Sequence, residues 1–213
     1  SNYKTVFFTL GVLQIILGLS MIVPILAQFF YDQMDSGFVS SGVITIIFGV
    51  LFFLSNLDHN KKLSLPQAFL LTALSWLSIA IFGSLPFVFS NIELSLTDAF
   101  FESMSGITTT GSTILTNLNE TPKAILLWRA MLQWLGGIGI IVMAITLMPI
   151  MNIGGMQLFV ISTSNTPEKI LPKSKEVSVR LILVYIALTI TCAVFYKIFG
   201  MGFFDSIVHS MTT

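Results

Sequence analysis

Residues 101–113 have the sequence FESMSGITTTGST, in which an acidic and apolar stretch runs into a threonine run, a glycine and two further hydroxyl residues. On the N-terminal side of this stretch, residues 93–106 place apolar side chains at helical spacing, which predicts a short amphipathic helix. Thr97 and Asp98 are expected to cap the start of this helix, and Gly106 to end it. The sequence therefore predicts a helix too short to cross a membrane, followed by a turn of threonine and glycine.

Long apolar stretches lie on both sides of this region. Apolar residues make up 54% of the 213 residues and charged residues only 9%, whereas a soluble domain has about 25% charged residues. Much of the surface must therefore face lipid. Five stretches meet or approach the roughly 20 apolar residues that a membrane-spanning helix needs: residues 5–28, 38–56, 65–89, 124–150 and 180–200. The predicted fold class is an all-α integral membrane protein, and the first stretch is expected to be an uncleaved span.

The order of span, short helix, threonine/glycine turn and span is typical of a re-entrant pore loop. Non-helical backbone is tolerated at membrane depth only where it lines a water-filled path or is buried in protein. The same order begins again near the C-terminus, where residues 203–211 resemble residues 98–104 after a further span. The predicted organisation is a helix pair in residues 1–62, a complete span–pore-loop–span repeat in residues 63–160, a cytoplasmic connection in residues 161–179, and the truncated start of a second repeat in residues 180–213.

The basic residues outside the spans predict that the N-terminus lies in the cytoplasm. With this orientation seven Lys and Arg residues are inside and three are outside, as the positive-inside rule requires. The inside set is Lys4, Lys61, Lys62, Lys169, Lys173, Lys175 and Arg180, and the outside set is Lys123, Arg129 and Lys197. The outer face would carry an excess of acids, which would concentrate cations there. The expected location is the cell (inner) membrane, with several spans.

Residues 107–113, here named the Thr/Gly segment, have the residue types that a cation selectivity filter needs. Such a filter replaces the hydration shell of the ion with backbone carbonyl oxygens. It needs a residue without Cβ to permit the backbone twist, and a short helix whose negative C-terminal end points at the ion. Threonine runs also occur inside apolar helices, where the hydroxyls bond to helix carbonyls; the position between two spans favours the filter. The candidate ion-facing residues are Thr109, Thr110, Gly111 and Ser112.

Four stretches resemble the Trk/Ktr family of potassium-uptake proteins. Residues 101–113 are similar to the first pore loop of that family, and residues 127–140 (LWRAMLQWLGGIGI) to the helix that follows it. Residues 154–159 (GGMQLF) match the cytoplasmic end of that helix, and residues 209–213 (HSMTT) look like the approach to the second filter. The similarity extends from about residue 65 to the last residue. The two spans before it fit the TrkH-type arrangement, in which a helix pair precedes four pore repeats.

The resemblance implies that the chain is the N-terminal half of a potassium-translocating subunit. Four linked repeats would surround one path, each with a filter strand that has a single key glycine. Potassium, as the substrate, would bind at Thr109, Thr110 and Gly111, and Thr212 and Thr213 would approach the second filter. One strand and a fragment cannot surround an ion, so the remaining repeats of the subunit are needed. Further implied partners are a second subunit, forming a homodimer, and a cytosolic nucleotide-binding regulatory ring on the side of the cytoplasmic connection.

Glu102 and Arg129 are expected to support the pore loop. Arg129 lies near the outer end of a span, where a charged side chain is a functional candidate by default. The predicted role is an ion pair with an acid of the short helix, either Glu102 or Asp98; a direct role of Arg129 in cation passage is the alternative. Close helix packing is expected at three glycines of the same span, Gly136, Gly137 and Gly139.

The sequence leaves three functions open. The leading one is potassium translocation through a carbonyl filter. The alternatives are a secondary transporter in which a broken helix at residues 106–113 binds a small solute, and a membrane scaffold that does not conduct. The chain has no Ser-His-Asp set, phosphate-binding loop or paired inward carboxylates, so an enzyme is not expected, and no cofactor is. The formal net charge of zero gives no indication of a nucleic-acid partner.

Overall fold

The computed structural model describes residues 3–58, 64–92, 94–151 and 170–213, and every regular element in these ranges is an α-helix. Five of the described helices are long and apolar enough to cross a membrane: Lys4–Phe30, Gly37–Ser55, Pro66–Phe89, Lys123–Met143 and Glu176–Ile198. They coincide with the five predicted spans. Residues 154–159 and the predicted boundaries after residues 62 and 160 lie outside the described residues. The chain divides into two compact units, mainly Ser1–Gly136 and Gly137–Met211, and each is described by itself.

The first span of the first unit consists of two helices, α1 (Lys4–Ser20) and α2 (Ile22–Phe30), which meet at Met21. The sequence predicts one continuous helix here. The break follows from Pro24, which has no N–H to donate to the carbonyl of Ser20 four residues earlier and whose ring crowds that carbonyl. The N–H of Met21 bonds instead to the carbonyl of Gly18, at 3.3 Å, in a tighter turn.

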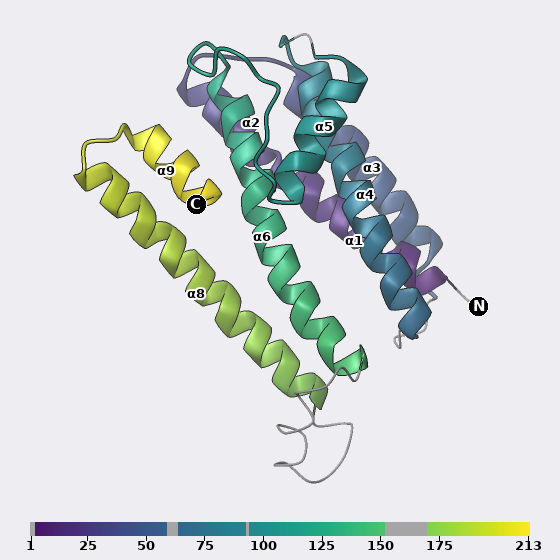
Figure 1. Cartoon of the computed structure of the whole chain (residues 1–213). Helices are drawn as coiled ribbons and strands as arrows, with labels where there is room; N and C mark the ends of the chain where they lie inside the picture. The colour runs from purple at the N-terminus through teal and green to yellow at the C-terminus, as the bar shows by residue number, and fades with distance from the viewer. Residues whose placement is uncertain (1–2, 59–63, 93, 152–169) are drawn as a thin grey trace. The chain divides into compact units, whose positions relative to one another are not determined.

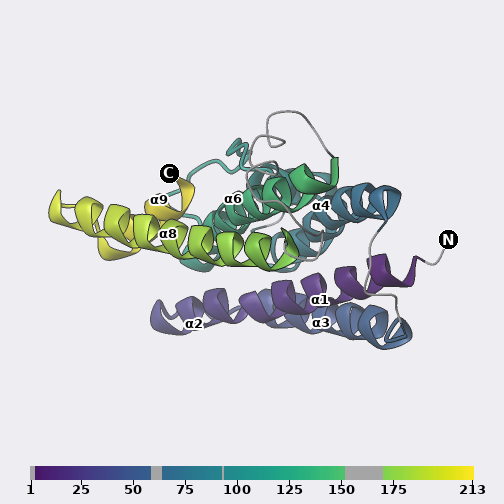
Figure 2. The same ribbon diagram turned by 90° about the horizontal axis from the view of Figure 1, so that it is seen from below.

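Helix α3 (Gly37–Ser55) lies alongside α1 (Figure 1 and Figure 2). Glycines on both helices permit this close approach. A Cβ added at Gly11 would lie 2.6 Å from the backbone nitrogen of Phe53 and 2.7 Å from the carbonyl oxygen of Gly49. Any larger residue at Gly11 would therefore push the two helices apart.

The part of the first unit that the sequence predicts to be a pore loop with its flanking spans contains α4 (Leu65–Phe89), α5 (Leu96–Ile107) and the first half of α6 (Lys123–Met151). Ser95, rather than Thr97 or Asp98, caps α5: its side chain accepts a hydrogen bond of 3.1 Å from the N–H of Asp98. Serine suits this position because its hydroxyl reaches an N–H of the first helical turn, which has no partner within the helix. The helix also continues one residue beyond the predicted end at Gly106.

The second unit contains the rest of α6, α8 (Ile170–Ile198) and α9 (Phe203–Thr212). Helix α8 begins ten residues before the predicted span, so residues 170–179 of the predicted connection are helical. Pro172 is compatible with this start because the first turn of a helix needs no N–H donors. An ion pair four residues apart, between Glu176 and Arg180 at 2.6 Å, further supports helix in this region.

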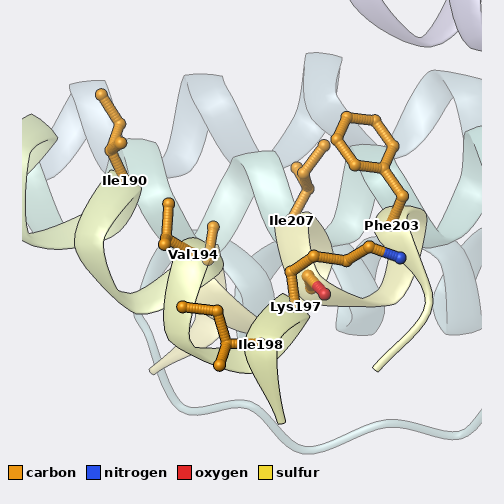
Figure 3. A pocket seen from close by; sticks show the side chains of 8 residues that line it. Ile190, Val194, Lys197, Ile198, Phe203 and Ile207 are labelled. Atoms are coloured by element: carbon orange, nitrogen blue, oxygen red, sulfur yellow. The ribbon is translucent and has the colours of Figure 1, made fainter. Parts of the chain in front are cut away.

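An open pocket of about 280 Å³ lies between α8 and α9 (Figure 3). Its lining is almost entirely apolar, and Lys197 is the charged side chain in it. The end of α9 is held against α8 by Tyr196, whose hydroxyl lies 3.0 Å from that of Thr213 and whose ring meets the ring of His209 edge-on.

Candidate functional site

The Thr/Gly segment leaves the end of α5 as non-helical backbone. Ile107 is the last helical residue, Thr108 and Thr109 form a turn, and residues 110–113 have no regular secondary structure. Gly111 has a φ of 78°, the left-handed conformation for which the sequence predicts glycine. Thr109 also has a positive φ, 57°, which the sequence does not predict. A β-branched residue in this conformation is strained, and such strain is concentrated at functional sites.

Ser105, in the last turn of α5, holds the segment from one side. Its carbonyl oxygen accepts hydrogen bonds from the N–H groups of Thr110, at 3.0 Å, and Gly111, at 3.3 Å. Its hydroxyl donates to the carbonyl oxygen of Ser112, at 2.6 Å. The chain therefore folds back over the end of the short helix. No expectation from the sequence gives Ser105 this role; its only signal there is a hydroxyl residue two positions before the segment.

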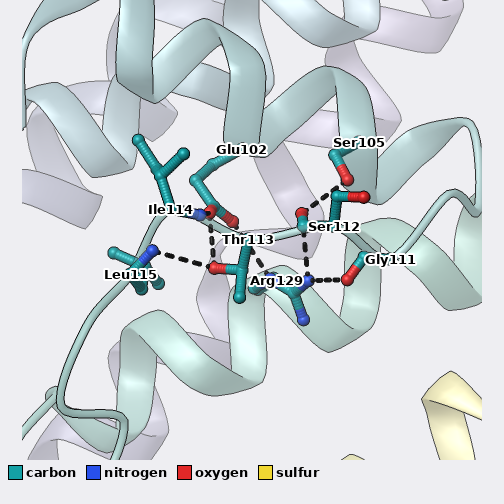
Figure 4. A network of polar contacts seen from close by, with 8 residues as sticks. All are labelled: Glu102, Ser105, Gly111, Ser112, Thr113, Ile114, Leu115 and Arg129. Atoms are coloured by element: carbon teal, nitrogen blue, oxygen red, sulfur yellow. Dashed lines mark hydrogen bonds and ion pairs between the residues drawn. The ribbon is translucent and has the colours of Figure 1, made fainter.

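Glu102 and Arg129 form the ion pair that the sequence predicts (Figure 4). The Glu102 side chain is fully buried, and its Oε2 lies 3.0 Å from the Nε of Arg129. Its other oxygen accepts hydrogen bonds from the hydroxyl of Thr113, at 2.5 Å, and from the N–H of Ile114, at 2.6 Å. Asp98, the alternative partner, bonds to the capping serine instead. The buried carboxylate thus joins α5, α6 and the C-terminal end of the Thr/Gly segment.

Arg129 also bonds directly to the Thr/Gly segment (Figure 4). Its Nη2 donates to the carbonyl oxygens of Gly111, at 2.7 Å, and Ser112, at 3.3 Å. By contrast, no residue in the described part of the chain donates a hydrogen bond to the carbonyl oxygens of Thr109 and Thr110. The four candidate ion-facing residues, all of them exposed, therefore form two pairs: two carbonyls bonded to an arginine and two available to a ligand.

Three further residues of α6 fix the surroundings of the segment. Trp128 is fully buried, and its indole N–H donates to the carbonyl oxygen of Gly83 in α4, at 2.9 Å. A Cβ at Gly136 would collide with the carbonyl oxygen of Ile107 at the end of α5. The side-chain amide nitrogen of Gln133 would lie 3.0 Å from a Cβ at Gly111. The predicted packing role of Gly136 is confirmed, whereas no pattern in the sequence indicates a role for Gln133.

The other two glycines of this helix differ from each other. A Cβ at Gly137 would lie 2.5 Å from the hydroxyl oxygen of Tyr185 in α8, whereas one at Gly139 would have nothing within 4 Å. Close packing is therefore present at Gly137, and Gly139 has no close neighbour among the described residues. At the other end of the chain, Thr212 is the last residue of α9, and the hydroxyl of Thr213 donates to the carbonyl oxygen of His209, at 2.7 Å.

Known proteins resemble this chain over nearly its whole length. The family model described as "TrkH: Cation transport protein" matches residues 34–213. The Trk system potassium uptake protein TrkH of Halomonas elongata is 41% identical over 208 residues, which are 96% of this chain and 43% of that protein. The protein of the same name from Escherichia coli K12 is 38% identical over 216 residues, 100% of this chain and 45% of that protein.

A solved structure also matches. The crystal structure of the potassium transporter TrkH from Vibrio parahaemolyticus superimposes with a TM-score of 0.87 at 36% sequence identity, covering 99% of this chain and 42% of that one. The chain thus spans less than half the length of the relatives it matches. The likeness confirms the predicted fold class, an all-helical membrane protein with several spans.

Proposed function

Because the chain belongs to the TrkH family of cation transport proteins, we propose that it forms part of a subunit that moves potassium across the cytoplasmic membrane. The Thr/Gly segment is one strand of the selectivity filter. One observation carries this assignment: a non-helical segment is held on one side by Ser105 and Arg129, and two successive carbonyls accept no hydrogen bond from any described residue. Membership of a transport family also agrees with the expectation that the protein is not an enzyme.

The carbonyl oxygens of Thr109 and Thr110 are the main potassium ligands of this strand. Each carbonyl oxygen carries two lone pairs, so the oxygen of Gly111 can still contribute while it accepts from Arg129, whereas that of Ser112 already accepts from both Arg129 and Ser105. The contribution of Gly111 is weaker because a guanidinium charge lies on its other side. Gly111 supplies the backbone conformation, and the negative end of the α5 dipole faces the strand. Potassium bound at Thr109, Thr110 and Gly111 fits this arrangement.

Arg129 supports the strand rather than acting as an ion carrier. An unpaired guanidinium next to the path would repel potassium, by about 4 kcal/mol for unit charges 4 Å apart at an effective dielectric constant of 20. The buried carboxylate of Glu102, 3.0 Å from Arg129, offsets that charge. The pair therefore lets a cationic side chain bind the strand's carbonyls without opposing the passage of a cation.

The complete transport unit requires partners. The remaining pore repeats of the subunit supply the other filter strands, membrane lipid surrounds the spans, and a second subunit completes a homodimer. A cytosolic nucleotide-binding ring regulates the pore from the side of residues 161–179. The N-terminus lies in the cytoplasm, which the seven basic residues against three support. The names of the relatives place them in a Trk system, which supports an assembly of more than one component.

The sharpest test compares two strained glycines in a complete subunit. Gly111 and Gly200 both have a positive φ, 78° and 97°, and a Cβ at Gly200 would meet nothing within 4 Å. Gly111→Ser and Gly200→Ser therefore introduce similar backbone strain, on the order of 1–2 kcal/mol, but only the first changes the Thr/Gly segment. Growth of a potassium-uptake-deficient strain at low external potassium, and the potassium-to-sodium flux ratio in liposomes, report the function.

We expect Gly111→Ser to lower selectivity for potassium far more than it lowers the amount of protein in the membrane. Gly200→Ser should retain the selectivity of the unaltered subunit. If both variants grow at low potassium and discriminate potassium from sodium as the unaltered subunit does, Gly111 is not a filter residue. Saturable uptake of a small solute without potassium flux would favour the carrier, and the absence of any transport would favour the scaffold.

A further inference from the structure

The outer loop of the N-terminal helix pair bonds to the pore-loop region at two separate points. One carboxylate oxygen of Asp35 accepts from the N–H of Gly37 at the start of α3, at 3.0 Å, and the other accepts from the N–H of Asn91, at 3.1 Å. The side-chain oxygen of Gln33 accepts from the N–H of Lys123, at 3.0 Å. Residues 33–37 are here named the strap. Asn91 lies in the connection that leads into α5, and Lys123 is the first residue of α6.

The two chain segments that the strap holds do not fill the space between them. An open pocket of about 390 Å³ lies between residues 91, 92 and 94 of the connection before α5 and residues 114–117 and 120–122 of the chain that follows the Thr/Gly segment. Dispersion contacts across such a space are lost, so packing alone does not fix how far apart these segments lie. The hydrogen bonds from the strap act on both sides of the pocket, one on Asn91 and the other on Lys123.

A buried contact continues the connection from the strap to the filter strand. Phe38 follows the strap directly, is fully buried, and meets the ring of Trp128 edge-on, with ring centroids 6.1 Å apart. A Cβ at Gly37 would lie 2.8 Å from the backbone nitrogen of Ser90, so the strap also touches the end of α4. Trp128 precedes Arg129, which bonds to the strand's carbonyls. A displacement of the strap would therefore move α6 and its arginine.

We propose that the strap is a positioning element for ion selectivity, in which Asp35 and Gln33 hold the entry to α5 and the start of α6 at the spacing that the filter strand requires. This inference rests on the proposed function of the Thr/Gly segment. It gives the N-terminal helix pair a role in transport: the pair anchors the outer mouth of the pore from outside the pore repeat. Neither positioning residue touches the ion, so both act through the backbone N–H groups that they bind.

The test uses two matched pairs of variants in the complete subunit, reconstituted in liposomes. Asp35→Asn removes one carboxylate acceptor, and Asp32→Asn removes the same charge from the same loop. Asp32 is a sound control because it is exposed and has a φ of 52°, a conformation that asparagine tolerates well. Gln33→Leu removes the acceptor for Lys123, whereas Gln33→Glu keeps an oxygen in the same place. The measurements are the half-saturating potassium concentration, the maximal flux and the inhibition of potassium flux by sodium.

Asp35→Asn and Gln33→Leu should each lower the discrimination of potassium from sodium by roughly three- to tenfold, the effect of losing one hydrogen bond that orders the mouth. The maximal potassium flux per inserted protein should change by a smaller factor than the discrimination of potassium from sodium. Asp32→Asn and Gln33→Glu should keep the discrimination of the unaltered subunit. If Asp35→Asn does not insert in the membrane, the Gln33 pair decides by itself.

Two results would overturn the positioning role. One is unchanged discrimination in Asp35→Asn and Gln33→Leu; the other is an equal loss in Asp32→Asn, which would leave only a general effect of charge at the mouth. Both differ from a failure of the proposed function, in which the unaltered subunit itself shows no potassium-selective flux. That result would remove the positioning role together with the filter.

Discussion

The two short helices α5 and α9 share a sequence pattern but differ in their surroundings. Each follows a long helix and has an acid in its first turn, Asp98 in α5 and Asp205 in α9. Helix α5 begins with a side-chain cap and buries six residues; α9 follows Gly202, has no side-chain cap in the described chain, and buries two residues. When the two acids are aligned, the buried Glu102 of α5 corresponds to His209 of α9.

This difference shows that forming a short helix and fixing the chain that follows it depend on different residues. The pattern of aromatic residues, an acid and small residues is enough to place a short helix after a span. The chain after α5 is held in addition by Glu102, which bonds to Arg129 of α6 and to Thr113. At the corresponding position of α9, the ring of His209 meets the ring of Tyr196 in the preceding span edge-on. We therefore attribute the fixed position of the chain after α5 to the acid at position 102.

The largest effect should come from removing that acid. Glu102→Ala leaves Arg129 without its ion-pair partner and two donors, of Thr113 and Ile114, without an acceptor. We expect a loss of about 3 kcal/mol in folding stability, at the lower end for a broken buried pair because Arg129 is partly exposed. His209→Ala, at the aligned position of α9, should cost less than about 1 kcal/mol. Thermal unfolding of the complete subunit in detergent compares the two; equal losses would contradict the difference between the helices.

The next effect concerns how closely α6 approaches the end of α5. Gly136→Ala places a methyl group against the carbonyl oxygen of Ile107, which should cost about 1–3 kcal/mol as overpacking. Gly139→Ala, one turn away with nothing within 4 Å of its Cβ, should be neutral or slightly stabilising because alanine favours helix over glycine. Membrane yield and unfolding temperature measure both variants. If Gly136→Ala is as stable as Gly139→Ala, α5 and α6 do not approach as closely as described.

A smaller effect is expected from the serine that holds the Thr/Gly segment. Ser105→Ala removes the hydroxyl that donates to the carbonyl oxygen of Ser112 and should cost about 1 kcal/mol. The half-saturating potassium concentration should rise, because the strand becomes less ordered. In α9, the hydroxyl of Ser210 bonds to the carbonyl of Ile207 in its own helix, so Ser210→Ala should leave flux unchanged. A shift of the same size in both serine variants would argue against a specific role for Ser105.

The smallest effect is expected at the contact between α9 and α8. Tyr196→Phe removes only the hydroxyl that meets Thr213 at an exposed position, and the ring contact with His209 stays. The expected loss of stability is about 0.5 kcal/mol, the low end for one hydrogen bond. An unfolding-temperature shift as large as that of Glu102→Ala would mean that α9 is held as firmly as α5.

Local features of the sequence predict much of this molecule. The five spans, the short helix before the Thr/Gly segment and the need for glycine at position 111 all depend on neighbouring residues, and the structure agrees with each. The ion pair of Glu102 and Arg129 is predictable as well, because a charge inside a span needs a partner.

Other features depend on contacts that no local pattern contains. Asp35 bonds to a residue 56 positions away and Gln33 to one 90 positions away, and both acceptors are ordinary loop residues in the sequence. Arg129 is identifiable as a charge, but its bonds to the carbonyls of Gly111 and Ser112 require knowing how the segment folds back. The break at Met21 and the early start of α8 are errors of a different kind, since apolar length predicts a span but not where its helix bends or begins.

Locating the bound ion tests whether Thr109 and Thr110 are potassium ligands. A structure of the complete subunit in rubidium or thallium, determined with anomalous scattering, reveals the sites of these potassium substitutes independently of the protein atoms. We expect a peak at direct coordination distance from the carbonyl oxygens of Thr109 and Thr110, with the Arg129 side chain on the other side of the strand. Ordered cations elsewhere in the subunit, with none at these two oxygens, would contradict this expectation.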